Sequence, residues 1–430
     1  MNQLREIISG SSLRDKLAAV FILLFALLLP FGGVPASGIF ILISIVWLVD
    51  NDWKEKLARL KANKLYLFPV LLFLVYILGV LYSENKDEAW DLVGRKSALI
   101  IFPLMFLSLR IPDKFNIRHV LAFFAAGCLL TLIACFGIAI CHFYDERHQV
   151  ALGLVRDTYI NREFFYASRL SYFMHPSYEA MYVVFASYFI FNSLFRMEKV
   201  FSLKGMLLML LNLIFAVFVF YLASRMGMIA LLLLWIGAIV MFFVMRKKYV
   251  QGLLLFIALA VSFVVIYKRS DIIASRFDYA IHTFFSKEVD KTSTESSSVR
   301  RLIWGVSTDI IKQNWLTGVG TGDVEDELTK SYVANGMTGA DEHHLNCHDQ
   351  FLQTFIAIGI AGELILLLCL FLPLIRRWKM KDHLFVVFML LFVLNILVES
   401  MFETRAGIFF FAFFYCLIPV ISRSSSEVNM

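Results

Sequence analysis

The chain has 430 residues, of which 60% are hydrophobic and only 17% are charged. That is too little charge to cover a soluble globule of this size, so lipid must contact much of its surface. The net charge of +6 does not indicate nucleic-acid binding, because the basic residues fall in short clusters between apolar runs. The composition therefore excludes a soluble enzyme and a nucleic-acid-binding protein, and it indicates a membrane protein.

Apolar runs long enough to cross a bilayer recur along the chain. A helix needs about 20 apolar residues to span the hydrocarbon core. Applied to this sequence, that length predicts an all-α polytopic membrane protein with about twelve transmembrane helices. The expected spans are residues 17–33, 36–50, 64–83, 94–110, 118–142, 174–195, 203–222, 226–245, 249–267, 350–375, 383–398 and 404–422.

The basic residues predict how these spans are oriented. With the N-terminus inside, the short cytoplasmic loops contain clusters such as Lys54–Lys64, Arg246–Lys248 and Arg376–Lys381, as the positive-inside rule requires. We therefore expect both termini in the cytoplasm. Two outward segments, 143–173 and 268–349, are long enough to escape this rule, and function is best sought there.

The outward segments divide the chain into three predicted parts. Residues 1–267 contain spans one to nine, 268–349 form a large outward loop, and 350–430 contain spans ten to twelve. Within the loop, the polar stretch 286–298 is typical of a surface loop. The apolar spacing over 299–311 predicts a short amphipathic helix on the membrane surface, between spans nine and ten.

Three arginines on the predicted outward side are candidates for anion binding. Arg225 lies in a tight turn before span eight, and Arg300 and Arg301 begin the amphipathic helix. An arginine at the membrane edge is costly unless it is paired or binds an anion, and guanidinium groups match phosphate oxygens in geometry and charge. A lipid diphosphate is the natural anion at that depth. The alternatives are a snorkelling arginine at the turn and ordinary basic residues of an interfacial helix.

Histidines near the start of span ten are candidates for proton transfer or metal binding. His348 opens that span, and an imidazole can accept a proton from a sugar hydroxyl near neutral pH; the alternative is an ordinary helix-end residue. The segment Asp341-Glu342-His343-His344 is the best metal candidate, because His344 and His348 are four apart and would share a helix face. No third ligand has diagnostic spacing, so we expect a polar loop without a metal.

Two further patterns have structural interpretations. The glycine-rich segment 318–323 resembles a nucleotide-binding fingerprint but lacks a preceding strand, so we expect a tight turn after the surface helix. Glu399 and Glu403 lie at the outward end of span eleven beside Arg405. Ionisable groups near lipid need partners, which predicts an ion-pair cluster.

Four motifs, in order along the chain, resemble those of one family. They are His175-Pro176-Ser177-Tyr178, Ser224-Arg225-Met226-Gly227, Arg300 four residues before Trp304 with Gly318-Val319-Gly320-Thr321-Gly322 downstream, and His348 followed by Gly359 and Gly362. In these motifs the chain resembles the O-antigen ligase and O-antigen polymerase superfamily of bacterial surface-polysaccharide assembly. It departs from the family pattern at Asp349, where an amide or hydroxyl is usual, and at Ser177, where asparagine is usual.

The resemblance implies a function and a place in the cell. Members of the superfamily are membrane glycosyltransferases of the GT-C type that use undecaprenyl-diphosphate-linked glycans and need no metal or nucleotide cofactor. It implies a bacterial inner-membrane protein with a periplasmic active site, and the spacing from His348 to the glycines favours a ligase with a lipid A-core acceptor. A polysaccharide polymerase, a protein O-oligosaccharyltransferase, a transporter of a lipid-linked or anionic substrate and a metal-dependent hydrolase stay open as alternatives.

The expected mechanism assigns a role to each candidate residue. Arg225 and Arg300 bind the diphosphate and stabilise its growing charge, and His348 takes the proton of the acceptor hydroxyl. Arg301 is expected to make a secondary contact with phosphate or acceptor, while apolar grooves between spans hold the polyprenyl chain among the membrane lipids. Further substrate contacts are expected from His175, Tyr178, Asp349 and Glu399.

Overall fold

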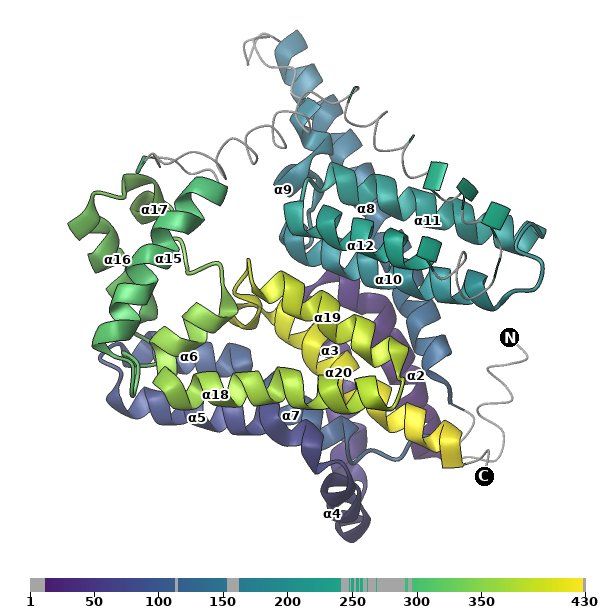
Figure 1. The fold of residues 1–430 in the computed structure, drawn as a ribbon, viewed down its shortest axis with the longest axis horizontal. Coiled ribbons are helices and arrows are strands. Elements are labelled where there is room, and N and C mark those ends of the chain that lie inside the picture. The colour runs from purple at the N-terminus through teal and green to yellow at the C-terminus, as the bar shows by residue number, and fades with distance from the viewer. Residues whose placement is uncertain are drawn as a thin grey trace. The chain divides into compact units, whose positions relative to one another are not determined.

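The computed structural model describes residues 12–112, 115–152, 162–240 and 296–427, with a few positions between 247 and 292 (Figure 1). All regular structure among these residues is helical. The predicted ninth span, 249–267, and the polar stretch 286–298 lie largely outside the described residues. The helices are α2 Leu13–Leu28, α3 Gly33–Val49, α4 Trp53–Ala62, α5 Phe68–Tyr82, α6 Lys86–Lys96, α7 Ala98–Phe106, α8 Ile117–Ala151, α9 Ala167–Leu170, α10 Pro176–Arg196, α11 Leu203–Tyr221, α12 Arg225–Val240, α15 Ser296–Gln313, α16 Val324–Asn335, α17 Thr338–Glu342, α18 Gln350–Lys379, α19 His383–Ile396 and α20 Arg405–Glu427, with short 3₁₀ turns at Leu29–Phe31, Lys64–Leu67, Arg162–Phe165 and Met401–Glu403.

The chain is a multi-pass membrane protein, and helices occupy most of the predicted spans. Five helical segments of the described chain are long and apolar enough to cross a membrane, or six if the bent pair α3–α4 counts as one span. They are Lys64–Tyr82, Ile117–Gln149, Leu203–Tyr221, Gln350–Lys379 and Arg405–Ser422. Helices α12 and α19 are apolar but shorter. The total of about twelve spans stays a prediction.

Two predicted elements differ in detail from the structure. Residues 94–110 are not one continuous helix: α6 ends at Lys96, and the short apolar helix α7, which contains Pro103, follows. The predicted amphipathic helix 299–311 forms part of α15, and the outward loop also contains α16 and α17. A proline in a helix removes a backbone hydrogen bond and clashes with the preceding turn, which helps to explain why α7 stays short.

The helices form two compact units. The first comprises residues 1–19, 41–117 and 277–430, and the second comprises residues 20–40 and 118–276. Each unit has its own tightly packed interior. The predicted division into three topological parts describes loop positions instead of packing, and it stays a prediction.

Aromatic side chains fill the core of the first unit. Helix α20 places Phe410, Phe411, Phe413 and Phe414 at zero exposure, packed largely against phenylalanines of α7 and α19. Burying a phenylalanine side chain away from water stabilises a protein by about 1.5–3 kcal/mol. Where the side chain would otherwise face lipid, the stabilisation comes mainly from close packing. The aromatic rings of these three helices therefore form one packed core.

Helix α18 is broken near its middle, and the glycine-rich segment fills the break. Ile358 and Gly359 have non-helical dihedrals, which leaves carbonyl groups of the preceding turn without their usual helical partners. Val319 N–H donates to the Ile356 carbonyl at 2.8 Å and Gly320 N–H donates to the Ala357 carbonyl at 3.1 Å. In return, Ile360 N–H donates to the Trp315 carbonyl at 3.0 Å. The predicted tight turn is therefore a connection between the loop and α18.

The same segment fastens the end of α5. Thr321 Oγ1 donates to the Tyr76 carbonyl at 2.7 Å, and Gly322 N–H donates to Ser83 Oγ at 3.1 Å. The Asp323 carboxylate accepts from the backbone N–H groups of Glu84 and Asn85, at 2.9 and 2.7 Å. Helices α5 and α18 lie side by side in Figure 1. The loop therefore fixes the relative position of these two helices at one end of the unit.

The opposite end of the first unit holds the predicted cytoplasmic basic residues. Arg377, near the end of α18, donates to Tyr66 Oη at 2.5 Å and pairs with Asp382 at 2.9 Å. Lys56 is buried, and its ammonium group donates to the Trp47 and Asp50 carbonyls at the C-terminus of α3. The separation of these residues from the loop end agrees with the predicted topology. Which end faces the cytoplasm stays a prediction.

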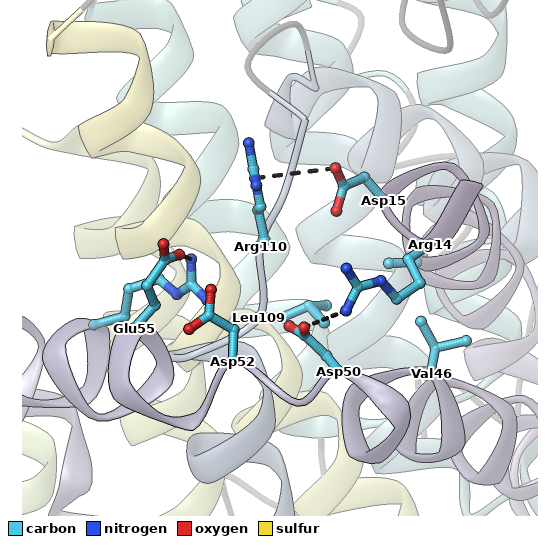
Figure 2. A pocket seen from close by; sticks show the side chains of 10 residues that line it. Arg14, Asp15, Val46, Asp50, Asp52, Glu55, Leu109 and Arg110 are labelled. Atoms are coloured by element: carbon cyan, nitrogen blue, oxygen red, sulfur yellow. Dashed lines mark hydrogen bonds and ion pairs between the residues drawn. The ribbon is translucent and has the colours of Figure 1, made fainter. Parts of the chain in front are cut away.

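A charged pocket lies at this basic end, where α2, the bend between α3 and α4, and residues 109–110 meet (Figure 2). Arg14 pairs with Asp50, and Arg110 Nε lies 4.0 Å from the Asp15 carboxylate. Each of these charges has a partner of opposite sign. We infer that these ion pairs hold α2 against the bend between α3 and α4.

Candidate functional site

Glu399 joins two of the predicted catalytic residues. Arg300 Nη2 donates to Glu399 Oε1 at 2.6 Å, and His348 Nδ1 lies 3.3 Å from Glu399 Oε2. The glutamate side chain is 7% exposed, whereas those of Arg300 and His348 are 17% and 21% exposed, so the carboxylate is covered and its two partners reach the surface. A buried carboxylate of this kind is stable only with such partners. Residues from α15, the start of α18 and the turn after α19 therefore meet at one place.

Glu399 and Glu403 do not pair with Arg405, the cation that the sequence places beside them. Glu399 contacts Arg300 and His348, whereas Glu403 pairs with Lys96 at 2.6 Å. Arg405 makes no ion pair among the described residues. The predicted ion-pair cluster exists, but its cations come from α6, which packs against the turn, and from α15, which packs against α18.

The loop before α18 fixes the position of His348. Trp304 Nε1 donates to the Cys347 carbonyl at 3.1 Å, and His348 N–H donates to Asn346 Oδ1 at 2.9 Å. His348 has a φ of 47°, a left-handed conformation that a non-glycine residue rarely adopts and that surrounding structure must impose. Trp304 lies one helical turn after Arg300, so the predicted Arg-x3-Trp spacing places the arginine beside the histidine loop.

Two neighbours of His348 have structural roles. Asp349 caps α18: its carboxylate accepts from the N–H groups of Phe351 and Leu352, at 2.8 and 3.0 Å. Burial raises the pKa of the Asp349 carboxyl. Asparagine and serine are equally good N-cap residues, so the departure from the family pattern preserves this bond. Burial also raises the pKa of Cys347 to about 12, so this thiol is neutral and unsuited to act as a nucleophile.

The predicted geometry of the metal candidate is wrong. Helix α17 ends at Glu342, and His344 and His348 both have positive φ, so they do not share a helix face. His344 is an exposed side chain 3.9 Å from Glu325, while His348 faces Glu399. Four-residue spacing brings side chains together only within a continuous helix. Among the described residues, no group of three or more histidine, cysteine, aspartate or glutamate side chains is placed to hold a metal ion.

The second unit holds Arg225 at the first position of α12. Ser224 Oγ accepts from Gly227 N–H at 3.2 Å and so caps this helix. A Cβ added to Gly227 would lie 2.5 Å from the Ala180 Cβ, so glycine lets α12 pack closely against α10. Arg225 is half-buried at a helix N-terminus, where the helix dipole favours an anion. That Arg225 and His348 belong to one site stays a prediction.

The motif at residues 175–178 begins α10 in the same unit. His175 is exposed and caps the helix, with its Nδ1 accepting from Ser177 N–H at 3.4 Å, and Tyr178 is buried. Ser171 Oγ donates to the buried carboxylate of Glu179, which holds the preceding turn in place. These contacts show that the motif forms the start of a helix. Substrate binding by His175 and Tyr178 stays a prediction, as it does for the exposed Arg301.

Residues 210–367 match the family model described as O-antigen ligase. This match supports the O-antigen ligase superfamily, because it places an O-antigen ligase domain over residues 210–367 of the chain. The ligase domain includes Arg225, Arg300 and His348, together with the glycine-rich segment and both glycines of α18. The predicted resemblance is therefore confirmed. A search of the curated proteins finds no match.

Glu399 lies outside the matched segment of the O-antigen ligase domain, and so does another residue that the sequence did not single out. Lys96 is 1% exposed and pairs with Glu403 in the turn that holds Glu399. Its sequence signal is a lysine at the junction of an amphipathic segment and an apolar run. That signal is weak, because a basic residue at a span end is usually a topological residue.

Proposed function

We propose that this O-antigen ligase family member transfers a glycan from undecaprenyl diphosphate to a hydroxyl of a lipid A-core acceptor on the periplasmic side of the bacterial inner membrane. The observation that supports the proposal is the contact of one carboxylate, Glu399, with both Arg300 and His348. A general base and an anion-binding group are thereby held together. These are the two kinds of group that transfer from a diphosphate donor requires.

His348 is the proposed general base. With Nδ1–H donating to Glu399, the other ring nitrogen, Nε2, has a free lone pair that can accept a proton from the acceptor hydroxyl. The carboxylate also stabilises the imidazolium that forms. A carboxylate behind a catalytic histidine recurs in unrelated enzymes because it fixes both the tautomer and the orientation of the ring.

The two arginines are the proposed anion site. A guanidinium has five N–H donors, so Arg300 can keep its bond to Glu399 and still bind phosphate oxygens. Arg225 adds a second guanidinium at a helix N-terminus. Arg301 supplies a secondary contact to phosphate or acceptor. Neither a metal ion nor a nucleotide is needed in this scheme, because the diphosphate is already a good leaving group.

The reaction is a single inverting displacement. The acceptor oxygen forms a bond to the anomeric carbon of the donor's first sugar while the bond from that carbon to the diphosphate oxygen breaks. The electron pair leaves with the undecaprenyl diphosphate, where the arginines stabilise it. The proton of the acceptor hydroxyl passes to His348 Nε2.

Incubation of the purified chain in lipid nanodiscs with an undecaprenyl-diphosphate glycan and lipid A-core tests the function. We expect release of undecaprenyl diphosphate together with a glycosylated acceptor, both measured by mass spectrometry. Products on a second repeat unit or on a secreted protein would instead identify a polymerase or a protein O-oligosaccharyltransferase. Unaltered donor that crosses a vesicle membrane would identify a transporter, and inhibition by chelators would identify a metal-dependent enzyme.

Arg225→Ala and Arg300→Ala are each expected to lose at least about 100-fold in transfer rate. Removing one preorganised charge that stabilises a transition state costs on the order of 3 kcal/mol. The measurement is the release of undecaprenyl diphosphate by purified variants, together with surface-glycan attachment in cells at unchanged protein abundance. Arg95→Ala is the matched control, because Arg95 pairs with Glu88 and Asp91 on the surface of α6. Wild-type glycosylation by both variants would remove the anion-site assignment.

A further inference from the structure

Lys96 is a buried lysine whose charge is directed into the turn after α19. Its ammonium group donates to the Phe402 carbonyl at 3.0 Å and to Glu403 Oε2 at 2.6 Å, and it lies 4.7 Å from the centre of the Tyr76 ring. Burying an ammonium group is costly unless it is fully paired, and here a carboxylate, a carbonyl and an aromatic face surround it. The lysine therefore holds Phe402 and Glu403 in one arrangement.

The same turn is tied to the start of α18. Phe402 N–H donates to Gln350 Oε1 at 2.6 Å, and Gln350 is buried two residues after His348. Gln350 Nε2 in turn donates to Thr354 Oγ1 at 3.1 Å. The same Thr354 Oγ1 forms a hydrogen bond with Tyr76 Oη at 3.1 Å. Both the N–H and the carbonyl of Phe402 are thus bound to side chains of other helices. Glu399 begins this turn three residues earlier, so its carboxylate depends on how Phe402 is held.

We propose that Lys96 is a positioning residue of the glycosyl-transfer site, which acts by holding the 399–403 turn so that the Glu399 carboxylate meets His348 and Arg300 together. Lys96 itself contacts neither His348 nor Arg300, so its effect passes through the turn and Glu399. The inference rests on the proposed function only for its effect on rate. The arrangement of His348 against Glu399 can be measured without any substrate.

The substrate-free experiment is carbethoxylation of His348 by diethyl pyrocarbonate in the purified full chain, followed by peptide mass spectrometry. The Glu399 carboxylate at Nδ1 sets the tautomer and the basicity of the imidazole, so a displaced carboxylate changes the rate at which the ring reacts. We expect Lys96→Met and Glu399→Gln to change the labelling rate in the same direction, each by about threefold or more. Lys86→Met is the matched control on the same helix: Lys86 also donates to two carbonyls, those of Val80 and Leu81, but not to the turn. Labelling of Lys96→Met at the wild-type rate would overturn the proposal.

Two further variants separate positioning from folding. Glu403→Gln leaves the bond from Lys96 to the Phe402 carbonyl in place, so we expect a smaller effect than with Lys96→Met. The double variant Lys96→Met/Glu403→Gln removes both charges and leaves no unpaired carboxylate, so it keeps the test valid if the single variant fails to fold. We expect it to label His348 as fast as Glu399→Gln, and wild-type labelling by the folded double variant would count against the proposal.

The rate of transfer gives an independent test. Lys96→Met is expected to lower kcat by about tenfold or more with little change in donor KM, and Lys96→Met/Glu399→Gln is expected to be no slower than Glu399→Gln alone. Additive losses in the double variant would show that Lys96 acts elsewhere, which overturns the proposal. If the wild-type chain transfers no glycan, the proposed function fails, whereas the labelling experiment still decides whether Lys96 positions Glu399.

Discussion

His348→Ala is expected to lower the rate of glycan transfer by about 100-fold to 10,000-fold, the usual contribution of a positioned general base. The chain should keep its abundance and its thermal stability, because the side chain is partly exposed and its loss leaves Glu399 paired with Arg300. The measurement is the initial rate of undecaprenyl diphosphate release by the purified variant at saturating donor. Cells with this variant should lack the surface glycan.

His344→Ala is the matched control for this prediction, since His344 lies in the same loop with a similar positive φ but an exposed side chain. It should transfer glycan at the wild-type rate. Glu399→Gln should lose less than His348→Ala, because the amide still accepts a bond but no longer stabilises the imidazolium. If His348→Ala were as active as His344→Ala, the general-base assignment would be wrong and Arg300 would act without it.

Gly359→Ala is expected to cause a large loss of stability. Gly359 has φ 62° and ψ −161°, a region essentially reserved for glycine, and an alanine Cβ would lie 2.4 Å from the Leu316 carbonyl oxygen. The conformational cost alone is about 1–3 kcal/mol, and the clash with backbone adds to it. The expected result is a lower melting temperature in detergent and reduced abundance in the membrane.

Gly305→Ala provides the opposite control. Gly305 lies within α15, and an added Cβ there meets nothing within 4 Å. Because alanine favours a helix by about 1 kcal/mol over glycine, this variant should be as stable as wild type or slightly more stable. If Gly359→Ala melted at the same temperature as Gly305→Ala, the break in α18 could not depend on glycine. The glycine-rich loop segment would then need another explanation.

The physical role of the glycine motifs follows from the tertiary structure and not from their spacing in the sequence. The spacing of Gly359 and Gly362 after His348 resembled the ligase pattern, but the sequence assigned those glycines no physical task. The structure shows that one of them breaks α18 and that the segment 318–322 supplies the missing backbone partners. No local pattern predicts this contact, because the hydrogen bonds join backbone groups. Nearly every residue type has the same backbone groups, so the residue types of the partners do not reveal the contact.

The sequence by itself determined the membrane class and the position of most helices, and its motifs indicated the family and three candidate residues. These features depend on local hydropathy, on the periodicity of helices and on motifs within short stretches of chain. Only the tertiary structure decided that Glu399 meets Arg300 from 99 positions away, and that Glu403 pairs with Lys96 from 307 positions away. A single charged side chain has many possible partners of opposite sign, and helix packing selects among them. That selection depends on the whole core, so no short segment of the sequence contains it.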